Sequence, residues 1–337
     1  MGKRIIVVKQ GGIGDVLLAT PVLRALKTRM PDSHLTLLVL PNAVDLVQGL
    51  PFIDELFPYD RKRQSIWKLI KKMRGHDIAL FLDLTYRPVL AAAVARVPGR
   101  VGIAHKRGKW LTKSLPWREA MDHTYEPYVF GEIVRDGLGI DIPHEELATI
   151  YAAEATDAER QDLTAKLAVH GLTPGTRYLA CSPKTAFFLK DWPLDRWNAL
   201  FRRLSAEHGL RTVLFGRGDL DFPWDNDAVV NLWNALTLRQ VKELIRGAAL
   251  LVNADSMPEH LAAAVGTPMV ILSGYSDPER WRPRQGCRRV TANLPCSPCD
   301  GYHGSTCQDP VCMREITVEQ VYEACIASLQ ERSGADD

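Results

Sequence analysis

Short, wholly apolar runs alternate with helical patterns along the first half of the chain. The apolar runs predict strands, and they lie at 4–10, 34–40 and 77–84. The helical patterns between and after them lie at 14–31, 65–75 and 88–99. Strands that are apolar on both faces and alternate with helices are typical of a parallel sheet covered on both sides. The first half therefore predicts a doubly wound α/β domain.

The second half repeats this alternation. It predicts strands at 178–183, 211–216, 249–255 and 268–274, and helices at 157–172, 195–209, 236–248 and 258–266. A turn-rich stretch at 165–177 is taken as the linker. The last helix is expected to begin at Thr317, which has capping-box spacing to Gln320. We therefore expect one domain at 1–170, a second at 171–315, and a C-terminal helix and tail at 316–337.

Composition narrows the class of protein. The 337 residues include 42 Lys and Arg against 40 Asp and Glu, and this near balance argues against a nucleic-acid-binding protein. The start, MGKRIIVVKQGG, has too short an apolar run for a signal peptide or a membrane span. We expect a cytosolic protein. In that reducing compartment, clustered cysteines indicate a metal site rather than disulfides.

The loop VKQGGIGDVLLATP lies between the first strand and a helix, where α/β sheets bind ligands. Gly12 and Gly14 fit a dinucleotide fingerprint, but its third position is Leu17, so NAD binding at this loop is disfavoured. Asp15 leaves two alternatives. It could cap the helix, or it could be a general base beside glycines that let an acceptor sugar approach closely.

The segment LLVNADSMPEHLAAAVG combines a buried strand with a capped helix. Ser256 and Glu259 have capping-box spacing, and Gly266 stands where a C-terminal cap belongs. Capping does not account for Asp255 at the strand end or for His260 in the first helical turn. Backbone N–H groups and the helix dipole make this a predicted cradle for a diphosphate.

A second polar junction, SPKTAFFLKDWPLDRW, follows the strand at 178–183. Ser182, Thr185 and Lys190 supply hydroxyls and a cation that could stabilise a leaving pyrophosphate. The alternative for Lys190 is an ordinary solvated lysine.

Four cysteines lie within seventeen residues near the C-terminus, spaced as Cys296-x₂-Cys299-x₇-Cys307-x₄-Cys312 with His303 between them. Four thiols at this spacing predict a tetrahedral zinc or iron site with a structural role. The alternative is reduced, unligated thiols.

The chain resembles glycosyltransferase family 9, the ADP-heptose:lipopolysaccharide heptosyltransferases. The resemblance rests on GGIGDVLLATP, on KDWPLDRW, on NADSMPEHLAAAVGTPMVILSGYSDPERWRP, and on the cysteine-bearing tail. It implies the GT-B architecture, in which two Rossmann-like doubly wound domains face each other across a cleft. The domain at 1–170 would bind an anionic, lipid-linked oligosaccharide acceptor, and the domain at 171–315 would bind ADP-heptose.

The resemblance also assigns roles to single residues. Asp15 corresponds to the family's general base, Lys190 to a lysine that contacts donor phosphates, and a donor-binding segment corresponds to Asp255, Ser256 and His260. The chain departs from the family at Met257, where a glycine is usual, and at Asn234–Ala235, where a donor-side lysine is common. Both departures concern the identity of the nucleotide sugar.

The mechanism expected from these residues is an inverting single displacement that requires no metal cofactor. Gly12, Gly14 and Arg87 are the predicted acceptor contacts, and clusters of Lys and Arg could also touch the anionic inner face of the inner membrane. The alternatives are a relative that uses another nucleotide sugar or a protein acceptor of the autotransporter type, a non-catalytic metal-binding scaffold, and an NAD-dependent oxidoreductase.

Overall fold

The computed structural model describes residues 2–299 and 307–333. The chain divides into two compact units, Met1–Glu154 and Ala155–Asp337, here called unit 1 and unit 2. The boundary therefore differs from the expected one at residue 170. Helix α7 (Asp157–Val169) overlaps only the first five residues of the expected linker at 165–177, and it belongs to unit 2, where Gln240 Nε2 donates to the Glu159 carbonyl at 3.0 Å.

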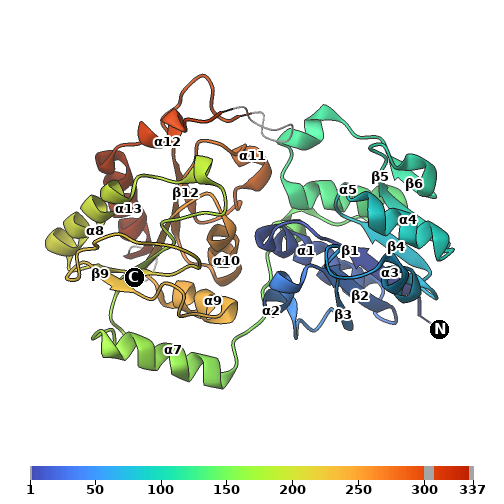
Figure 1. Cartoon of the computed structure of the whole chain (residues 1–337), viewed down its shortest axis with the longest axis horizontal. Coiled ribbons are helices and arrows are strands. Elements are labelled where there is room, and N and C mark those ends of the chain that lie inside the picture. Colours follow the sequence, from blue (N-terminus) through green and yellow to red (C-terminus); the bar gives the residue numbers. More distant parts are fainter. Residues whose placement is uncertain (1, 300–306, 334–337) are drawn as a thin grey trace. The chain divides into compact units, whose positions relative to one another are not determined.

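Unit 1 is built on a sheet of six parallel strands (Figure 1). Its strands are β1 (Arg4–Val8), β2 (His34–Val39), β3 (Glu55–Pro58), β4 (Ile78–Phe81), β5 (Gly99–Ile103) and β6 (Lys113–Leu115). They lie in the order β3-β2-β1-β4-β5-β6. The order turns back at β1, so the crevice between the carboxyl ends of β1 and β4 is where such a sheet binds its ligand.

Helices cover both faces of this sheet. They are α1 (Ile13–Arg29), α2 (Val44–Val47), α3 (Ile66–Met73), α4 (Tyr86–Val94), α5 (Glu126–Leu138) and α6 (His144–Leu147), with 3₁₀ turns η1 (Pro41–Ala43), η2 (Gly108–Trp110) and η3 (Glu119–His123). Ile6 and Val8 of β1 pack against apolar side chains of α3 and α4 on one face. Helices α1 and α5 pack against each other on the other face (Figure 1).

Unit 2 repeats the strand order of unit 1. Its parallel strands are β7 (Tyr178–Cys181), β8 (Arg211–Leu214), β9 (Val229–Asn231), β10 (Leu250–Ala254), β11 (Met269–Leu272) and β12 (Cys287–Val290), in the order β12-β11-β10-β7-β8-β9. Strand β7 is here the counterpart of β1. Its helices besides α7 are α8 (Leu194–His208), α9 (Leu238–Gly247), α10 (Met257–Val265), α11 (Pro278–Trp281), α12 (Val311–Arg314) and α13 (Val318–Ser333), with the 3₁₀ turn η4 (Phe188–Lys190).

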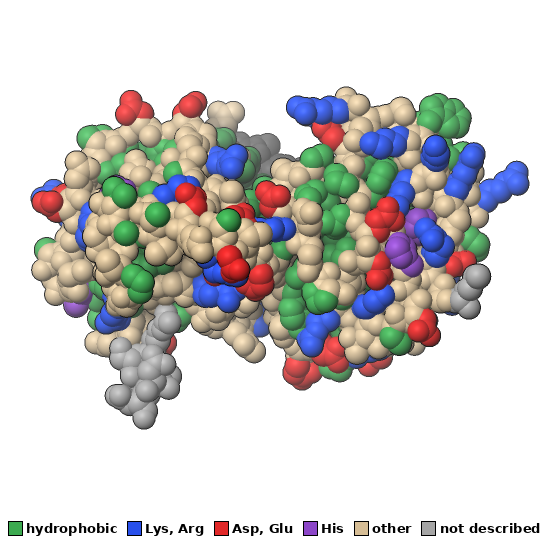
Figure 2. Space-filling model, turned by 90° about the horizontal axis from the view of Figure 1, so that it is seen from below, with side chains coloured by type: hydrophobic (Ala, Val, Ile, Leu, Met, Phe, Trp, Pro, Cys, Tyr) green, Lys and Arg blue, Asp and Glu red, His purple; other side chains and the backbone are tan. Residues whose placement is uncertain are grey.

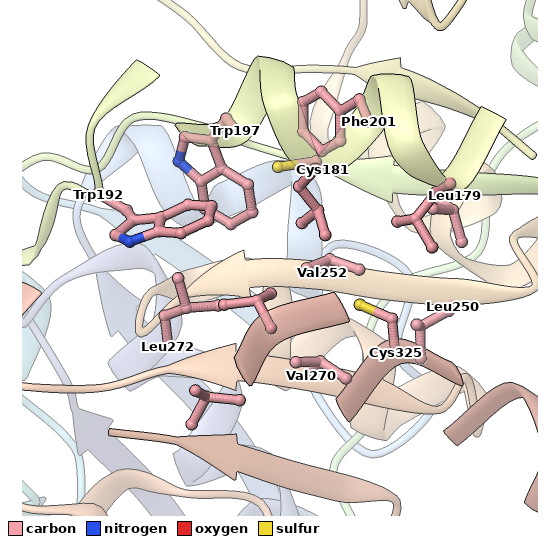
Figure 3. Packing of buried hydrophobic residues seen from close by; sticks show 14 of the residues in the cluster. Leu179, Cys181, Trp192, Trp197, Phe201, Leu250, Val252, Val270, Leu272 and Cys325 are labelled. Atoms are coloured by element: carbon pink, nitrogen blue, oxygen red, sulfur yellow. The ribbon is translucent and has the colours of Figure 1, made fainter. Parts of the chain in front are cut away.

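The core of unit 2 explains why the C-terminal helix is part of this domain rather than a separate tail (Figure 3). Cys325 of α13 is fully buried against the sheet, in one cluster with Cys181 of β7 and with α8. Trp192 and Trp197 meet edge to face at 4.7 Å between ring centroids. The indole N–H of Trp192 donates to the Ile316 carbonyl at 3.0 Å. Aromatic pairs of this geometry contribute about 0.5–1.5 kcal/mol beyond their buried area.

The helix caps that the sequence predicted are partly present. Thr317 and Gln320 form the expected capping box, with Gln320 N donating to Thr317 Oγ1 at 3.2 Å. Gly266 ends α10 in the left-handed conformation, with φ of 74°, where a side chain would be strained. In the described part of the chain, no helix is both long enough and apolar enough to cross a bilayer.

Candidate functional site

The loop after β1 is fixed by bonds to both neighbouring strands. Lys9 N donates to the Leu38 carbonyl of β2 at 3.0 Å. Gln10 N donates to Asp83 Oδ2, beyond the end of β4, at 2.7 Å. The loop therefore leaves the sheet at the switch point of the strand order, and the position of the residues that follow is set by the sheet itself.

Asp15 lies in the first turn of α1, half-buried, and it does act as a cap. Its Oδ2 accepts a hydrogen bond from Gly12 N at 2.8 Å. Its Oδ1 accepts none from any described residue, so capping uses only one of the two carboxylate oxygens. Gly12 is the N-cap of α1, and Gly14 is the second residue of the helix. The structure thus places all three predicted residues in one turn.

Gly11 is a residue of this turn that the sequence did not single out. A Cβ atom at Gly11 would lie 2.2 Å from Asp15 Oδ2, whereas a Cβ at Gly12 would lie at an ordinary 3.7 Å. The Asp15 carboxylate therefore occupies the space that a side chain at Gly11 would need. The signal was present in the sequence, as a glycine pair directly before Gly-Asp, but only packing shows which glycine matters.

Two further polar residues under this loop were also missed. Lys9 is buried, with its Nζ 3.8 Å from Glu126 Oε1 and 3.5 Å from the Leu82 carbonyl. Asp83 Oδ1 accepts from Thr85 N at 2.9 Å. Lys9 directly follows β1 and Asp83 lies two residues beyond the end of β4, at the edge of the sheet where such folds bind their ligands.

Arg87, the predicted acceptor contact, is engaged within unit 1. Its guanidinium donates to the Arg61 carbonyl at 3.2 Å and to the Gln64 carbonyl at 3.1 Å. It also lies 5.8 Å from the centre of the Tyr59 ring. These contacts give Arg87 a role in holding the loop before α3.

In unit 2 the expected capping box at the start of α10 is absent. Ser256 is the N-cap of the helix, but its side chain makes no capping hydrogen bond. The hydroxyl donates to the Ala254 carbonyl at 3.1 Å and accepts from Asn253 Nδ2 at 2.9 Å. The prediction was wrong because the Ser256 hydroxyl bonds to Asn253, the last polar residue of β10, and to the Ala254 carbonyl instead of the helix N–H groups. No side chain in the described part of the chain caps the N-terminus of α10.

Lys190 and Asp255 come together as a pair, although 65 residues separate them in the sequence. Lys190 Nζ lies 3.5 Å from Asp255 Oδ2, and the side chains are only 22% and 10% exposed. Lys190 also lies 6.0 Å from the centre of the Tyr275 ring. The alternative of a simply solvated lysine is therefore not what the structure shows.

Glu259 lies beneath this pair rather than capping the helix. It is 2% exposed, and burial followed by the nearby Asp255 carboxylate raises its pKa well above the usual range. A neutral Glu259 avoids placing a second buried negative charge beside Asp255. His260 is also buried, with its Nε2 3.6 Å from Glu259 Oε1.

The hydroxyl groups of Ser182 and Thr185 donate to backbone carbonyls of the loop that follows β7. Ser182 Oγ donates to the Lys184 carbonyl at 3.2 Å, and Ser182 N donates to Asn253 Oδ1 at 2.7 Å. Thr185 Oγ1 donates to the Phe187 carbonyl at 2.8 Å. Asn253 therefore links the two predicted donor segments, since it contacts both Ser182 and Ser256.

The four clustered cysteines are described, but residues 300–306 between them, with His303, lie outside the described residues. Cys299, Cys296 and Cys307 each raise the pKa of Cys312 electrostatically, after burial as the first cause. The thiols thus lie in one region. Among the described residues, however, no three His, Cys, Asp or Glu side chains are grouped so that they could hold a metal ion.

Glu259→Gln is expected to remove a pH-dependent loss of stability. Because native Glu259 holds its proton more tightly than the unfolded chain, whose carboxyl titrates near 4.5, the wild-type free energy of unfolding falls as the pH rises above that value. The glutamine variant carries no such proton. Urea unfolding at about pH 6 and about pH 8 should show that its stability relative to wild type increases with pH. The exposed Glu323→Gln variant is the control, and an equal pH dependence in all three proteins contradicts the prediction.

Comparison with known proteins gives this geometry its context. The sequence model of glycosyltransferase family 9 (heptosyltransferase) matches residues 66–306. Lipopolysaccharide heptosyltransferase 3 of Escherichia coli is 27% identical over 295 residues, which cover 80% of this chain and 83% of that protein.

Two solved structures share the fold along nearly the whole chain. The family 9 glycosyl transferase from Veillonella parvula DSM 2008 has a TM-score of 0.84 at 22% identity and covers 98% of both chains. E. coli ADP-heptose lps heptosyltransferase II has a TM-score of 0.74 at 21% identity and covers 98% of this chain and 99% of that one. The expected GT-B fold is confirmed, and the protein is an enzyme that belongs to glycosyltransferase family 9.

Proposed function

We propose that the enzyme transfers a heptose from ADP-heptose to an anionic, lipid-linked acceptor of the lipopolysaccharide inner core, with inversion at the anomeric carbon. The family match and the activities named for the E. coli relatives support this donor and this acceptor class. We place the reaction in the cytoplasm at the inner face of the inner membrane, since a lipid-linked acceptor lies in a membrane surface.

The arrangement at the start of α10 carries the donor part of the proposal. Its N-terminal N–H groups have no side-chain cap, and Lys190 stands beside Asp255 at the same strand edge. A helix N-terminus favours negative charge, and a lysine adds a point charge that can neutralise a departing diphosphate. This set supplies the charge that a metal cofactor would otherwise bring, so we propose that the transfer requires none.

Asp15 is proposed as the general base. One acceptor hydroxyl attacks the anomeric carbon as its proton passes to Asp15 Oδ1, the oxygen that capping leaves over. The new bond joins the acceptor oxygen to the anomeric carbon, and the bond from that carbon to the diphosphate oxygen breaks. ADP leaves with the electron pair on the opposite side, which inverts the configuration. Gly12 and Gly14 leave room for the acceptor at this turn.

The two departures from the family pattern fall on the donor side. Met257 is the first residue of α10 and is half-buried, so its side chain stands beside the proposed diphosphate position. At the other departure, Lys166 of α7 donates to the Ala235 carbonyl at 2.9 Å. A lysine from another element therefore stands near the position where the family often has one. This favours a retained nucleotide diphosphate site over a non-catalytic scaffold.

We also propose that Cys296, Cys299, Cys307 and Cys312 hold a zinc or iron ion with a structural role. Their donor chemistry fits either metal, and the electrostatic influence of the other three on Cys312 supports a common location. An ion bound there would fix the segment before α12 and have no step in the transfer.

Asp15→Asn is expected to lower turnover by about 10²–10⁴-fold while leaving the affinity for ADP-heptose nearly unchanged, because the amide cannot accept the proton. ADP release with inner-core oligosaccharide as acceptor measures turnover, and thermal shift with ADP-heptose, ADP, UDP-glucose and NAD measures donor choice. Exposed Asp32→Asn is the control. Turnover within a few-fold of wild type would exclude Asp15 as the base, and stabilisation by UDP-glucose or NAD alone would exclude ADP-heptose as donor.

Gly11→Ala is expected to cut turnover by about 10²-fold, because its Cβ would displace the Asp15 carboxylate by roughly an ångström or more. Gly12→Ala is the matched control for kcat at saturating acceptor, since its Cβ meets the carboxylate at an ordinary distance and crowding of the acceptor there would raise KM. Steady-state kinetics of the two variants, at equal helical content, compares them. Equal turnover would mean that the carboxylate position does not limit the reaction.

Anaerobically purified protein is expected to contain about one equivalent of zinc or iron. Replacing Cys299 and Cys307 with serine should remove the metal and lower the midpoint of thermal unfolding, whereas replacing Cys181 and Cys325 should leave the metal in place. Metal below about a tenth of an equivalent in the wild type would refute the site.

A further inference from the structure

The charges of the chain are strongly uneven along the sequence. Between Arg61 and Arg118 there are fifteen Lys and Arg but only two acidic residues, Asp77 and Asp83. The rest of the chain holds 27 basic and 38 acidic residues. The near-neutral total therefore conceals a strongly basic segment of unit 1.

Neither acidic residue of this segment neutralises its basic side chains directly. Asp77 Oδ2 accepts from Arg4 N at 2.7 Å, and Asp83 accepts from the backbone N–H groups of Gln10 and Thr85. Both carboxylates are thus engaged with backbone at the ends of β4. Apart from the buried Arg107, on which Asp83 acts electrostatically, the excess positive charge is left to the outer surface.

Helix α3 presents part of this charge together with an exposed tryptophan. Its inner face buries Leu69, Ile70 and Met73. Trp67, Lys71 and Arg74 recur at i, i+4 and i+7, which places them on one outward face, with Lys68 beside Trp67. All four are exposed, and the Trp67 side chain is 71% exposed. We call these four residues the α3 surface.

The α3 surface has no carboxylate partners among the residues that the structure describes. Across the described ranges, Lys68, Lys71 and Arg74 form no ion pair with an acidic side chain, whereas Lys72 on the flank is paired with Glu55. Lys and Arg side chains gather along one side of the N-terminal unit in Figure 2, with few acidic side chains among them. An exposed tryptophan lowers the solubility of a protein. Its exposure among unpaired cations therefore indicates an interaction surface.

Aromatic side chains continue onto the neighbouring elements of the same layer. Helix α4 packs beside α3 and exposes Tyr86, 46% exposed, whose hydroxyl accepts from Trp110 Nε1 at 2.7 Å. Lys109 Nζ lies 5.4 Å from the centre of the Trp110 ring. Amphipathic rings interleaved with long basic side chains are the combination that favours the headgroup level of a bilayer.

We propose that the α3 surface docks unit 1 onto a bilayer rich in anionic phospholipid. Lysine and arginine would lie among the headgroup phosphates, while the Trp67 indole would enter the boundary with the acyl chains. A duplex nucleic acid would use the cations through its phosphates but would leave Trp67 in water, because its base faces are stacked inside the helix. The pairing of an outward tryptophan with cations on one helical face is what favours a lipid surface.

Binding of the full-length enzyme to vesicles tests the proposal without any sugar substrate. Vesicles of phosphatidylcholine, with and without phosphatidylglycerol, are sedimented with the protein at low and high salt. We expect binding only to the anionic vesicles and weakening by salt. The triple variant Lys68→Glu, Lys71→Glu, Arg74→Glu should bind at least about 100-fold more weakly, since each basic residue near such a surface is worth roughly fivefold.

Two further variants keep the result specific. Arg177→Glu, Arg202→Glu, Arg246→Glu makes the same charge change on exposed residues of unit 2 and should bind like wild type. Trp67→Ala keeps the charge and should still bind several-fold more weakly. The proposal is overturned if wild type binds neutral vesicles as well as anionic ones, or if both triple variants lose binding alike. It is also overturned if Trp67→Ala binds like wild type and added heparin fully displaces the protein from the anionic vesicles. Because no nucleotide sugar is present, a negative result leaves the transferase assays untouched.

Discussion

The parallel alignment of every strand pair described in the two sheets is the constraint on which both sites depend. Parallel strands bring all their carboxyl ends to one edge. The loop that precedes Asp15 therefore meets Asp83, because β1 and β4 are neighbours. In the same way Lys190, after β7, reaches Asp255, after β10. Reversing one strand of either sheet would carry one member of that sheet's pair to the opposite edge.

The sequence predicts this scaffold well because its strands are apolar on both faces, a pattern that only a sheet covered twice can satisfy. It predicts the pairing of Lys190 with the Asp255 segment only through family resemblance, since spacing of 65 residues carries no geometric information. Local spacing rules assign Ser256 to a capping box. This assignment fails because Asn253 donates a competing hydrogen bond to the Ser256 hydroxyl. It misses Gly11, since the clash there involves a side chain oriented by the fold.

Buried polar groups lie close to each proposed site and are stabilised differently. In unit 1, the buried Lys9 is balanced by Glu126 and by a backbone carbonyl. In unit 2, the raised pKa of Glu259 favours its neutral form, so Glu259 adds no second negative charge beside Asp255 and Lys190. Either solution avoids an uncompensated charge in a region of low dielectric, which costs several kcal/mol. The polar side chains at the sheet edge are thereby held in fixed positions.

The basic segment becomes a basic surface because of how the chain winds. Residues 61–118 build α3, β4, α4 and β5 in succession, and β4 and β5 are added in one direction across the sheet. Right-handed crossovers made in one direction place their helices on one face. Helices α3 and α4 therefore lie side by side, and basic residues that are close in sequence accumulate on one layer. The opposite face, covered by α1 and α5, receives none of this segment's helices, so the basic residues of α3 and α4 gather on one side of the sheet even though the whole chain is nearly neutral.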